Sequence, residues 1–227
     1  MNSINHIPKA EIHVHLEATI SPDLCRKLAK RNNVDLSEDL FAGQYVYAWE
    51  DFYDFLKQYD IITSVIHTPD DYRELTYNYL KKCAADHVIY VEAMISSTHA
   101  KLQGMTHDSF LEGVIEGANQ EREEFGIVSK YIMNGIRHLG PDSVYETAQQ
   151  LSEAGANVTV IDSRTNFKIE TNKNYEIRKG YVPYNINGSK KIDSLDISKS
   201  ETINKSETIN CDQVLLSGGW SPAVHLL

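Results

Sequence analysis

Glu11-Ile-His13-Val-His15-Leu-Glu17, close to the start of this chain of 227 residues, is the stretch that decides the fold. It lies in a short β-capable run, and Ser21-Pro22-Asp23 then supplies a helix N-cap with proline at the first helical position. On a strand, residues i and i+2 point to the same face, so we predict that His13 and His15 project together. Two adjacent imidazoles can bind one metal ion, and the alternative interpretation is a pair of half-buried strand histidines without a ligand.

Strand and helix patterns alternate along residues 1–140. Apolar residues recur every three or four positions in the helical stretches, whereas the strands are short runs rich in β-branched and aromatic residues. The predicted elements are strands over 10–16, 87–94 and 127–136, and helices from Ser21 to about Asn32, within 47–66, after the cap at Thr68-Pro69 and over 108–124. Strands separated by helices pair in parallel through right-handed crossovers, so we predict an α/β fold.

The composition is that of an acidic protein without a nucleic-acid or membrane partner. With 22 Lys and Arg against 32 Asp and Glu, the formal net charge is −10. Phosphate binding draws its affinity from clustered Lys and Arg, which this chain lacks. No apolar stretch approaches the roughly 20 residues of a membrane-spanning helix, and the first residues lack a secretory signal, so we expect a cytoplasmic location. Three widely spaced cysteines predict neither a disulfide framework nor a thiolate zinc site.

Residues 141–227 have a different texture, and we place a domain boundary near Gly140, giving domains over 1–140 and 141–227. Eight of the nine histidines precede the boundary. The second part predicts a helix over 142–154, a strand over 157–161 ending at Asp162, a β-ribbon within 175–197, and an apolar strand beginning at Val214. Two identical hexamers, Lys199–Asn204 and Lys205–Asn210, follow one another, and we interpret them as a loop duplication.

The first part resembles the adenosine and adenine deaminases over about residues 8–138. The segments that carry the resemblance are Pro8-Lys-Ala-Glu-Ile-His-Val-His-Leu-Glu-Ala-Thr-Ile20, Trp49-Glu-Asp-Phe-Tyr-Asp-Phe-Leu56, Thr68-Pro-Asp-Asp-Tyr72, Tyr77-Asn-Tyr-Leu80, Val88-Ile-Tyr-Val-Glu92, His99-Ala-Lys-Leu-Gln-Gly104 and Arg137. The resemblance implies a metal-dependent (β/α)₈ TIM barrel of the amidohydrolase type, of which this chain holds the truncated N-terminal part.

The same resemblance implies roles for five residues. His13 and His15 would be the first two zinc ligands, and Glu17 would contact the ribose or purine of the substrate. Phe55 and Leu56 would line the lid over the base, although periodicity alone assigns them to core packing. The family usually has glycine where this chain has an alanine, two residues before Ile20.

Several parts of such a site are missing from the sequence. The family supplies a third histidine, a catalytic glutamate, an orienting histidine and a ligating aspartate from later strands, and none of those motifs follows Arg137. The catalytic residues therefore stay unidentified, and His99 and His138 are the next histidines to consider as ligands. Glu92 closes a predicted strand, and we expect it near the barrel mouth.

The second part resembles a segment of the alpha subunit of sarcosine oxidase, a flavin- and nicotinamide-binding oxidoreductase component. The resemblance rests mainly on Ser217-Gly-Gly-Trp-Ser-Pro222 and implies an incomplete Rossmann-like segment over 141–227. Asp162, at a strand end, occupies the position where such folds hold a ribose hydroxyl. No glycine-rich phosphate loop precedes the helix, which favours a turn role for Asp162.

The sequence thus predicts a zinc-dependent purine deaminase-type hydrolase, acting on adenosine or adenine and incomplete in this chain. Two alternatives are an inactive chimeric fragment and a nucleotide-binding piece of a flavin or nicotinamide oxidoreductase.

Overall fold

The structure, a computed structural model, describes residues 6–135, 142–166, 175–202 and 204–215. Its contacts divide the chain into two compact units, Met1–Ile136 and Arg137–Leu227. Among the described residues, no helix is both long enough and apolar enough to cross a membrane.

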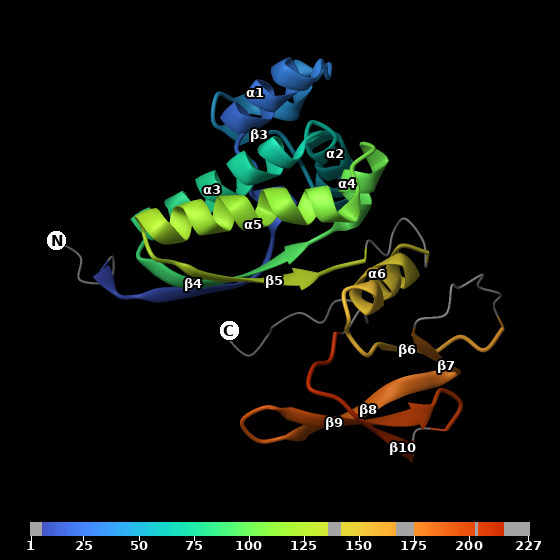
Figure 1. Ribbon diagram of the computed structural model, residues 1–227. Helices are drawn as coiled ribbons and strands as arrows, with labels where there is room; N and C mark the ends of the chain where they lie inside the picture. Colours follow the sequence, from blue (N-terminus) through green and yellow to red (C-terminus); the bar gives the residue numbers. More distant parts are fainter. Residues whose placement is uncertain (1–5, 136–141, 167–174, 203, 216–227) are drawn as a thin grey trace. The chain divides into compact units, whose positions relative to one another are not determined.

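The first unit is built on a three-stranded parallel sheet (Figure 1). Its strands are β1 (Lys9–His15), β4 (Val88–Ile95) and β5 (Val128–Met133), in the order β1-β4-β5. Both neighbouring pairs run parallel, so the predicted α/β arrangement with parallel pairing is confirmed. The carboxyl ends of these strands meet at one edge of the sheet, which is where enzymes of this architecture build their sites.

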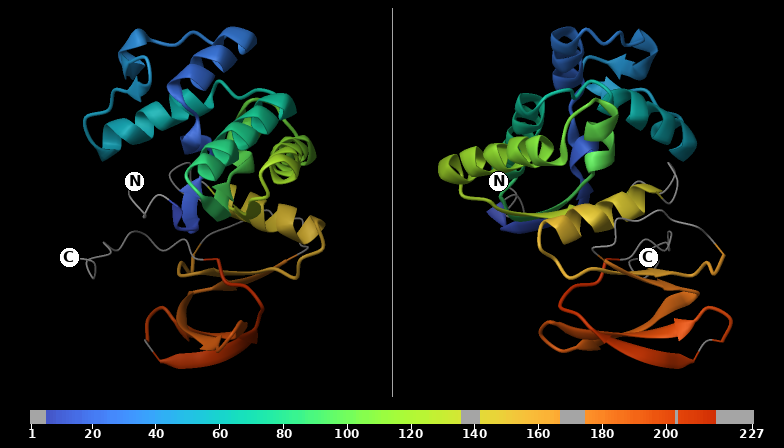
Figure 2. Two further views of the ribbon diagram at one scale, coloured as in Figure 1. Left: turned by 90° about the vertical axis from the view of Figure 1, so that its left-hand side faces the viewer. Right: turned by 45° about the vertical axis from the view of Figure 1, so that its right-hand side comes forward.

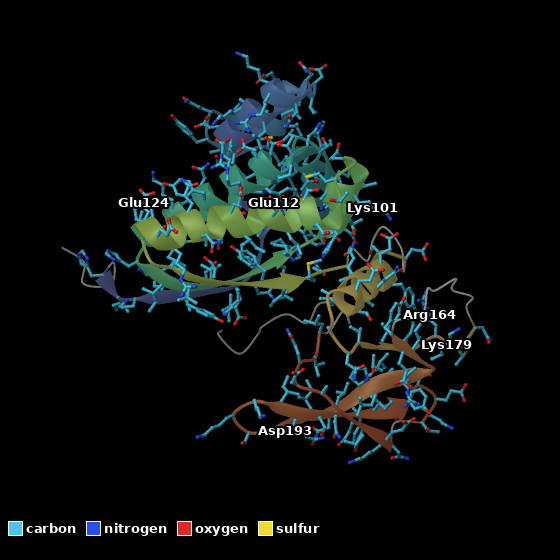
Figure 3. All side chains as sticks on the ribbon, in the orientation of Figure 1. Lys101, Glu112, Glu124, Arg164, Lys179 and Asp193 are labelled. Carbon is cyan, nitrogen blue, oxygen red and sulfur yellow. The ribbon has the colours of Figure 1, made fainter. Side chains whose placement is uncertain are left out.

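The helices of the first unit begin where the sequence supplies caps. α1 (Pro22–Asn32) starts after Ser21, whose side chain accepts a hydrogen bond from the Leu24 backbone N–H. α3 (Pro69–Ala85) starts with a reciprocal capping box between Thr68 and Asp71. The remaining helices are α2 (Phe52–Thr63), α4 (Ser97–Leu102) and α5 (His107–Glu124). The acidic residues Glu112 and Glu124 are exposed on α5 (Figure 3).

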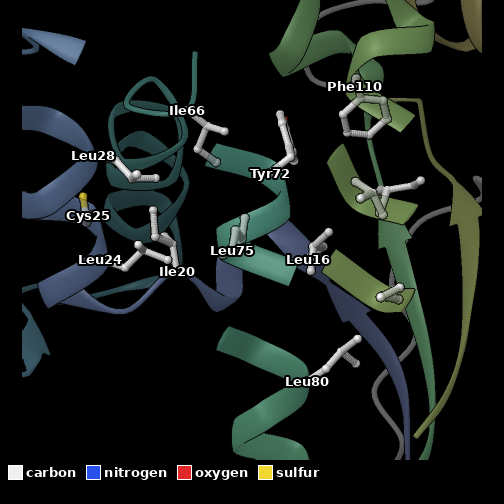
Figure 4. Close-up of a cluster of buried hydrophobic side chains, with 14 of the residues drawn as sticks. Leu16, Ile20, Leu24, Cys25, Leu28, Ile66, Tyr72, Leu75, Leu80 and Phe110 are labelled. Atoms are coloured by element: carbon white, nitrogen blue, oxygen red, sulfur yellow. The ribbon is translucent and has the colours of Figure 1, made fainter. Parts of the chain in front are cut away.

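The core of the first unit lies between the sheet and the helix pair α3 and α5, which run side by side over one sheet face (Figure 2). Leu16, Tyr72, Leu75 and Phe110 are almost completely buried there (Figure 4). The rings of Tyr72 and Phe110 meet edge to face with their centroids 4.7 Å apart. The two helices approach closely because Gly113 has no side chain: a Cβ there would lie 2.2 Å from the Pro69 carbonyl oxygen.

A small hairpin between α1 and α2 was not predicted. It consists of β2 (Phe41–Gly43) and β3 (Val46–Tyr47), and it follows a single 3₁₀ turn, η3 (Glu38–Leu40). Strands this short carry no periodicity that a sequence pattern could reveal. Aromatic stacking holds the hairpin, since the rings of Phe41 and Tyr47 lie 5.6 Å apart and the Arg26 guanidinium sits 3.7 Å above the Phe41 ring.

The second unit combines a parallel strand pair with an antiparallel sheet. α6 (Asp142–Glu153) precedes β6 (Thr159–Asp162), and β6 pairs in parallel with β7 (Glu176–Lys179). The antiparallel sheet has the order β10-β9-β8, with β8 (Tyr181–Gly188), β9 (Ile192–Lys199) and β10 (Lys205–Asn210). The predicted ribbon is confirmed as β8 and β9. The glycine turn and most of the strand predicted from Val214 onward lie outside the described residues.

The interpretation of the tandem hexamers as a loop duplication is wrong for the second copy. The first copy supplies the last residue of β9 and the turn that follows, whereas the second copy is strand β10. Ile209 of β10 faces Leu195 of β9, and Thr208 donates a hydrogen bond of 2.6 Å to the buried Asp196 carboxylate. Cross-strand contacts thus decide the conformation of the second copy.

Candidate active site

His13 and His15 lie at the carboxyl end of β1, with ring centroids 6.2 Å apart. The strand is not regular at this point. The pairing of β1 with β4 shifts between Ile12 and Val14, and His13 adopts the left-handed conformation with a φ of 65°. His13 is therefore the extra residue of a β-bulge, a device that re-aims side chains and is common beside active sites.

The bulge changes the reason for the histidine pairing. Plain alternation of a strand was the predicted cause, but the inserted residue interrupts that alternation. It allows Val14 to pack against the core while the imidazoles on either side of it stay close together. A left-handed residue that is not glycine costs on the order of 1–3 kcal/mol, so the rest of the unit must hold this conformation in place.

The electrostatic setting of His15 suits a metal ligand. Partial burial, with the neighbouring His13 adding to it, lowers the pKa of His15 below its ordinary value. The ring is therefore neutral at physiological pH, and a neutral imidazole nitrogen is the form that binds a metal ion.

Glu17 lies two residues beyond His15 in the 3₁₀ turn η2 (Leu16–Thr19) and is completely buried. Its Oε1 accepts a hydrogen bond of 3.0 Å from the backbone N–H of Ser96, which follows β4. Its Oε2 has no hydrogen-bond partner among the described residues. Burial raises the pKa of Glu17 to about 7, and the hydrogen bond from Ser96 opposes the rise. A buried carboxyl poised near neutrality is typical of functional sites.

A second set of side chains borders Glu17 from α2 and α4. The Tyr59 ring packs edge-on against His99 with centroids 5.3 Å apart, and His99 Nε2 lies 3.4 Å from Asp60 Oδ1. Burial, together with the nearby Glu17, raises the pKa of Tyr59. Sequence reasoning named His99 but missed Tyr59, because nothing in a helical apolar stripe separates a site residue from a core residue. His138 lies outside the described residues.

Phe55 and Leu56 lie on α2 and are both half-buried. The Phe55 ring contacts three other aromatic rings, with centroid distances of 5.3 Å to Trp49, 6.2 Å to Phe52 and 6.0 Å to Tyr59. Phe55 thus joins the exposed aromatic residues at the start of α2 to the Tyr59 and His99 pair.

Glu92 does not close its strand as predicted. β4 runs on to Ile95, so Glu92 lies within the strand, opposite Ile12 of β1 and Lys130 of β5. Its Oε1 accepts a hydrogen bond of 2.7 Å from the Tyr90 hydroxyl. The strand ends one residue beyond the predicted end at residue 94, because Ile95 continues the buried alternation of Val91 and Ala93.

A complete metal site is not formed within the described ranges. No cluster there contains three or more His, Cys, Asp or Glu side chains that could hold one ion. The two imidazoles at the end of β1 are the right donor type for zinc, but a catalytic zinc normally takes three protein ligands.

In the second unit, the Asp162 carboxylate accepts hydrogen bonds from neighbouring side chains. Arg164 donates to both carboxylate oxygens, at 3.0 and 2.6 Å, and the Tyr145 hydroxyl donates to Oδ2 at 2.7 Å. These bonds lower the pKa of Asp162 to about 2. The carboxylate is therefore a paired structural group at a strand end, as its sequence context favoured.

A parallel α/β sheet with a histidine pair and a buried carboxyl at its carboxyl edge has the kind of arrangement from which enzymes built on parallel strands form their sites. The sequence model of the adenosine deaminase family matches residues 8–178, and the chain belongs to that family. The match includes α6 and β6, which the resemblance over 8–138 had left out.

Adenine deaminases are among the relatives that this chain resembles. That of Rhizobium leguminosarum bv. trifolii (strain WSM2304) is 39% identical over 150 residues, which are 66% of this chain and 46% of the relative. That of Agrobacterium fabrum (strain C58 / ATCC 33970) is 40% identical over 145 residues, 64% of this chain and 44% of the relative. The chain thus spans less than half the length of these relatives.

Solved structures show the same fold. The adenine deaminase from Arthrobacter aurescens matches 68% of this chain and 48% of its own chain, with a TM-score of 0.58 and 28% identity. An amidohydrolase from Burkholderia ambifaria with bound Zn matches 71% of this chain and 53% of its own, with a TM-score of 0.53 and 18% identity.

Proposed function

We propose that this chain carries the amino-terminal part of a zinc-dependent purine deaminase, a hydrolase that acts on adenine or adenosine. The observation that supports this most directly is the histidine pair, with its rings 6.2 Å apart at the carboxyl end of β1, inside the family match. Adenine deaminases among the relatives favour adenine as the substrate. In such enzymes, bound zinc lowers the pKa of water so that hydroxide attacks the purine ring.

The residues of this chain would act around that ion. His13 and His15 would supply two of the ligands, and the lowered pKa of His15 keeps its nitrogen available. Glu17 would contact the substrate through its unpartnered oxygen. Because its pKa lies near 7, the carboxyl can be ionised and accept a hydrogen bond from the substrate, or be protonated and donate one to it. Phe55 and Leu56 would cover the base from α2, which excludes water from the reacting atoms.

Under this proposal the chain carries only some of the metal ligands and catalytic groups of the site. Two imidazoles hold a metal ion loosely, and a general acid or base must be positioned within about 3 Å of the proton it transfers. We therefore propose that the chain alone binds zinc weakly and does not turn over substrate.

Two other functions have less support. An inactive chimeric fragment would lack any usable part of a site. The closeness of the His13 and His15 rings argues against that alternative. A nucleotide-binding oxidoreductase piece would need a free acid at the end of β6, and Asp162 is bound to Arg164 and Tyr145 instead.

A hybrid chain tests the proposal. Residues 1–135 are fused to the part of the Rhizobium leguminosarum adenine deaminase that follows its residue aligned with position 135, and ammonia release from adenine is measured with zinc present. We expect turnover that His15→Ala abolishes and that Glu17→Gln weakens through a higher KM. A folded hybrid with unchanged activity after His15→Ala would refute the assignment.

A further inference from the structure

The hairpin of β2 and β3 is anchored to α1 through one side chain. The Arg26 guanidinium, which lies above the Phe41 ring, donates hydrogen bonds of 2.8 Å to the Gln44 carbonyl oxygen and 3.4 Å to that of Gly43. α1 itself is fixed in the core, where Leu28 is completely buried. Because a two-stranded hairpin is at best marginally stable alone, its place in the molecule is set by contacts of this kind.

Tyr47 of β3 fastens the hairpin to the turn that carries Glu17. Its hydroxyl donates a hydrogen bond of 3.0 Å to the Ile20 carbonyl oxygen. Ile20 is 2% exposed and directly follows η2, in which Glu17 is completely buried. Burial raises the pKa of the Tyr47 hydroxyl, so its oxygen keeps the proton that it donates. The end of η2 is therefore held by a donor from the hairpin.

The ring of the same side chain begins a series of aromatic contacts that leads into α2. Tyr47 stacks on Trp49, with centroids 5.4 Å apart and an interplanar angle of 22°, and Trp49 meets the Phe55 ring edge-on at 5.3 Å. Phe55 in turn lies 6.0 Å from Tyr59, whose ring contacts His99. One tyrosine thus contacts the site on two sides, through its hydroxyl and through its ring.

The first half of α2 has little else in the core to fix it. The buried residues of α2 are Ile62 and Thr63, both in its last turn. Phe55, near its start, is half-buried. A hydrogen bond from the Gln58 side-chain amide to the Ala48 carbonyl oxygen, directly after β3, supports the ring contacts. Because segments with few buried contacts open locally at low cost, we infer that the hairpin sets the position of this half of the helix.

We propose that Tyr47 is a positioning residue of the candidate site. Its hydroxyl fixes the turn that carries Glu17, and its ring fixes, through Trp49, the part of α2 that carries Phe55. The inference rests on the proposed function, which gives Glu17 and Phe55 their roles toward the substrate. Tyr47 acts through these neighbours, and the two actions come from different parts of one side chain, so substitutions can separate them.

Nuclear magnetic resonance on the full chain tests the action of the hydroxyl. Tyr47→Phe removes the hydroxyl and keeps the ring. The amide proton signal of Ser96 should shift, because that N–H is hydrogen-bonded to Glu17 and its resonance depends on the geometry of the bond. The Tyr59 ring signals should stay in place, since the aromatic series is intact.

Trp49→Leu tests the action of the ring and should give the opposite pattern. It interrupts the aromatic series and keeps the Tyr47 hydroxyl, and it should fold because Trp49 is 45% exposed. We expect the Tyr59 ring signals to shift although Tyr59 is one ring further on, and the amides of residues 52–58 to exchange about tenfold faster. The Ser96 amide signal should stay in place.

Tyr77→Phe is the matched control, because it also removes a tyrosine hydroxyl that donates to a distant residue, Glu124 of α5. It should move neither set of signals. An unchanged Ser96 signal in Tyr47→Phe refutes the proposal, and so do unchanged Tyr59 signals in Trp49→Leu or an equal rise in exchange at all core amides. The signals are read without zinc or adenine, so a hybrid chain that fails to turn over adenine refutes the proposed function and leaves the positioning intact.

Discussion

The backbone N–H of Ser96 donates a hydrogen bond of 3.0 Å to Glu17 Oε1, although the two residues are 79 positions apart. The bond joins the turn η2 after β1 to the residue that follows β4, and both residues are buried. A carboxyl group held in this way keeps a fixed position relative to both strand ends. The carboxyl edge of the sheet is therefore organised in this chain before any later strand is added.

The histidine pair predicts weak zinc binding. Calorimetry with the full chain should detect binding that His15→Ala weakens by at least about tenfold, because one of two ligands is removed. The control is His87→Ala, since His87 forms a second pair of adjacent imidazoles with His6, whose ring centroid is 5.2 Å away. Loss of binding with His87→Ala in place of His15→Ala would contradict the assignment.

The full chain should not deaminate adenine or adenosine above background, even with excess zinc. The described residues contain no third ligand for the ion, and electrostatic activation of water needs the ion to be held rigidly. The measurement is ammonia release by the purified chain over many hours. Turnover that disappears in His15→Ala would show that the ligand set is completed by another route, with His99 the first residue to test.

Gly113→Ala should destabilise the first unit by about 3 kcal/mol, at the upper end of the range for overpacking. The added Cβ would lie 2.2 Å from the Pro69 carbonyl oxygen, and backbone cannot move aside as a side-chain tip can. Urea denaturation measures the change. Gly43→Ala is the control, because nothing lies within 4 Å of its added Cβ, and the stability of that variant should stay close to that of the parent.

Glu121→Gln should stabilise the protein at neutral pH. Glu121 is completely buried on α5, and this burial raises its pKa, although a hydrogen bond from the Ile127 backbone opposes the rise. A raised carboxyl pKa means that the folded state favours the protonated form, so this contribution is present at low pH and is lost as the pH rises through the folded value.

The variant should therefore gain over the parent as the pH rises and match it near pH 4, below the ordinary carboxyl pKa of about 4.3. Urea denaturation across this range provides the test. Glu112→Gln, an exposed position on the same helix, should change nothing. An equal gain at every pH would contradict the role of the buried proton.

Much of the first unit could be predicted because its signals are local. Ser21 and Thr68 are caps that act through the next three residues, and the helices begin where they indicate. The parallel pairing of the strands was predicted from the alternation of strands and helices along the chain. The hairpin around Phe41 and Tyr47 could not be found in this way, since its stability comes from ring stacking between short segments.

The sequence indicated which residues to consider for the candidate site, but it did not indicate how their side chains are arranged. His13 and His15 could be selected from their spacing, but the bulge that sets their relation depends on how β1 meets β4. Tyr59 and Ser96 lie near Glu17 in the structure but come from distant segments of the chain. No single stretch of sequence indicates that these residues are neighbours. The domain boundary near residue 140 stays a prediction: the contacts divide the chain after Ile136, and the family match runs on to residue 178.

The two identical hexamers have different roles in the antiparallel sheet of the second unit. Because the copies are identical, removing either one leaves the same chain, in which six residues would have to serve both as the turn after β9 and as strand β10. A strand cannot fold back on its neighbour without a connection, so the copy next to β9 must remain the turn. We therefore expect a chain with a single copy to lose strand β10 from the antiparallel sheet, so that the second hexamer supplies a strand rather than a spare loop.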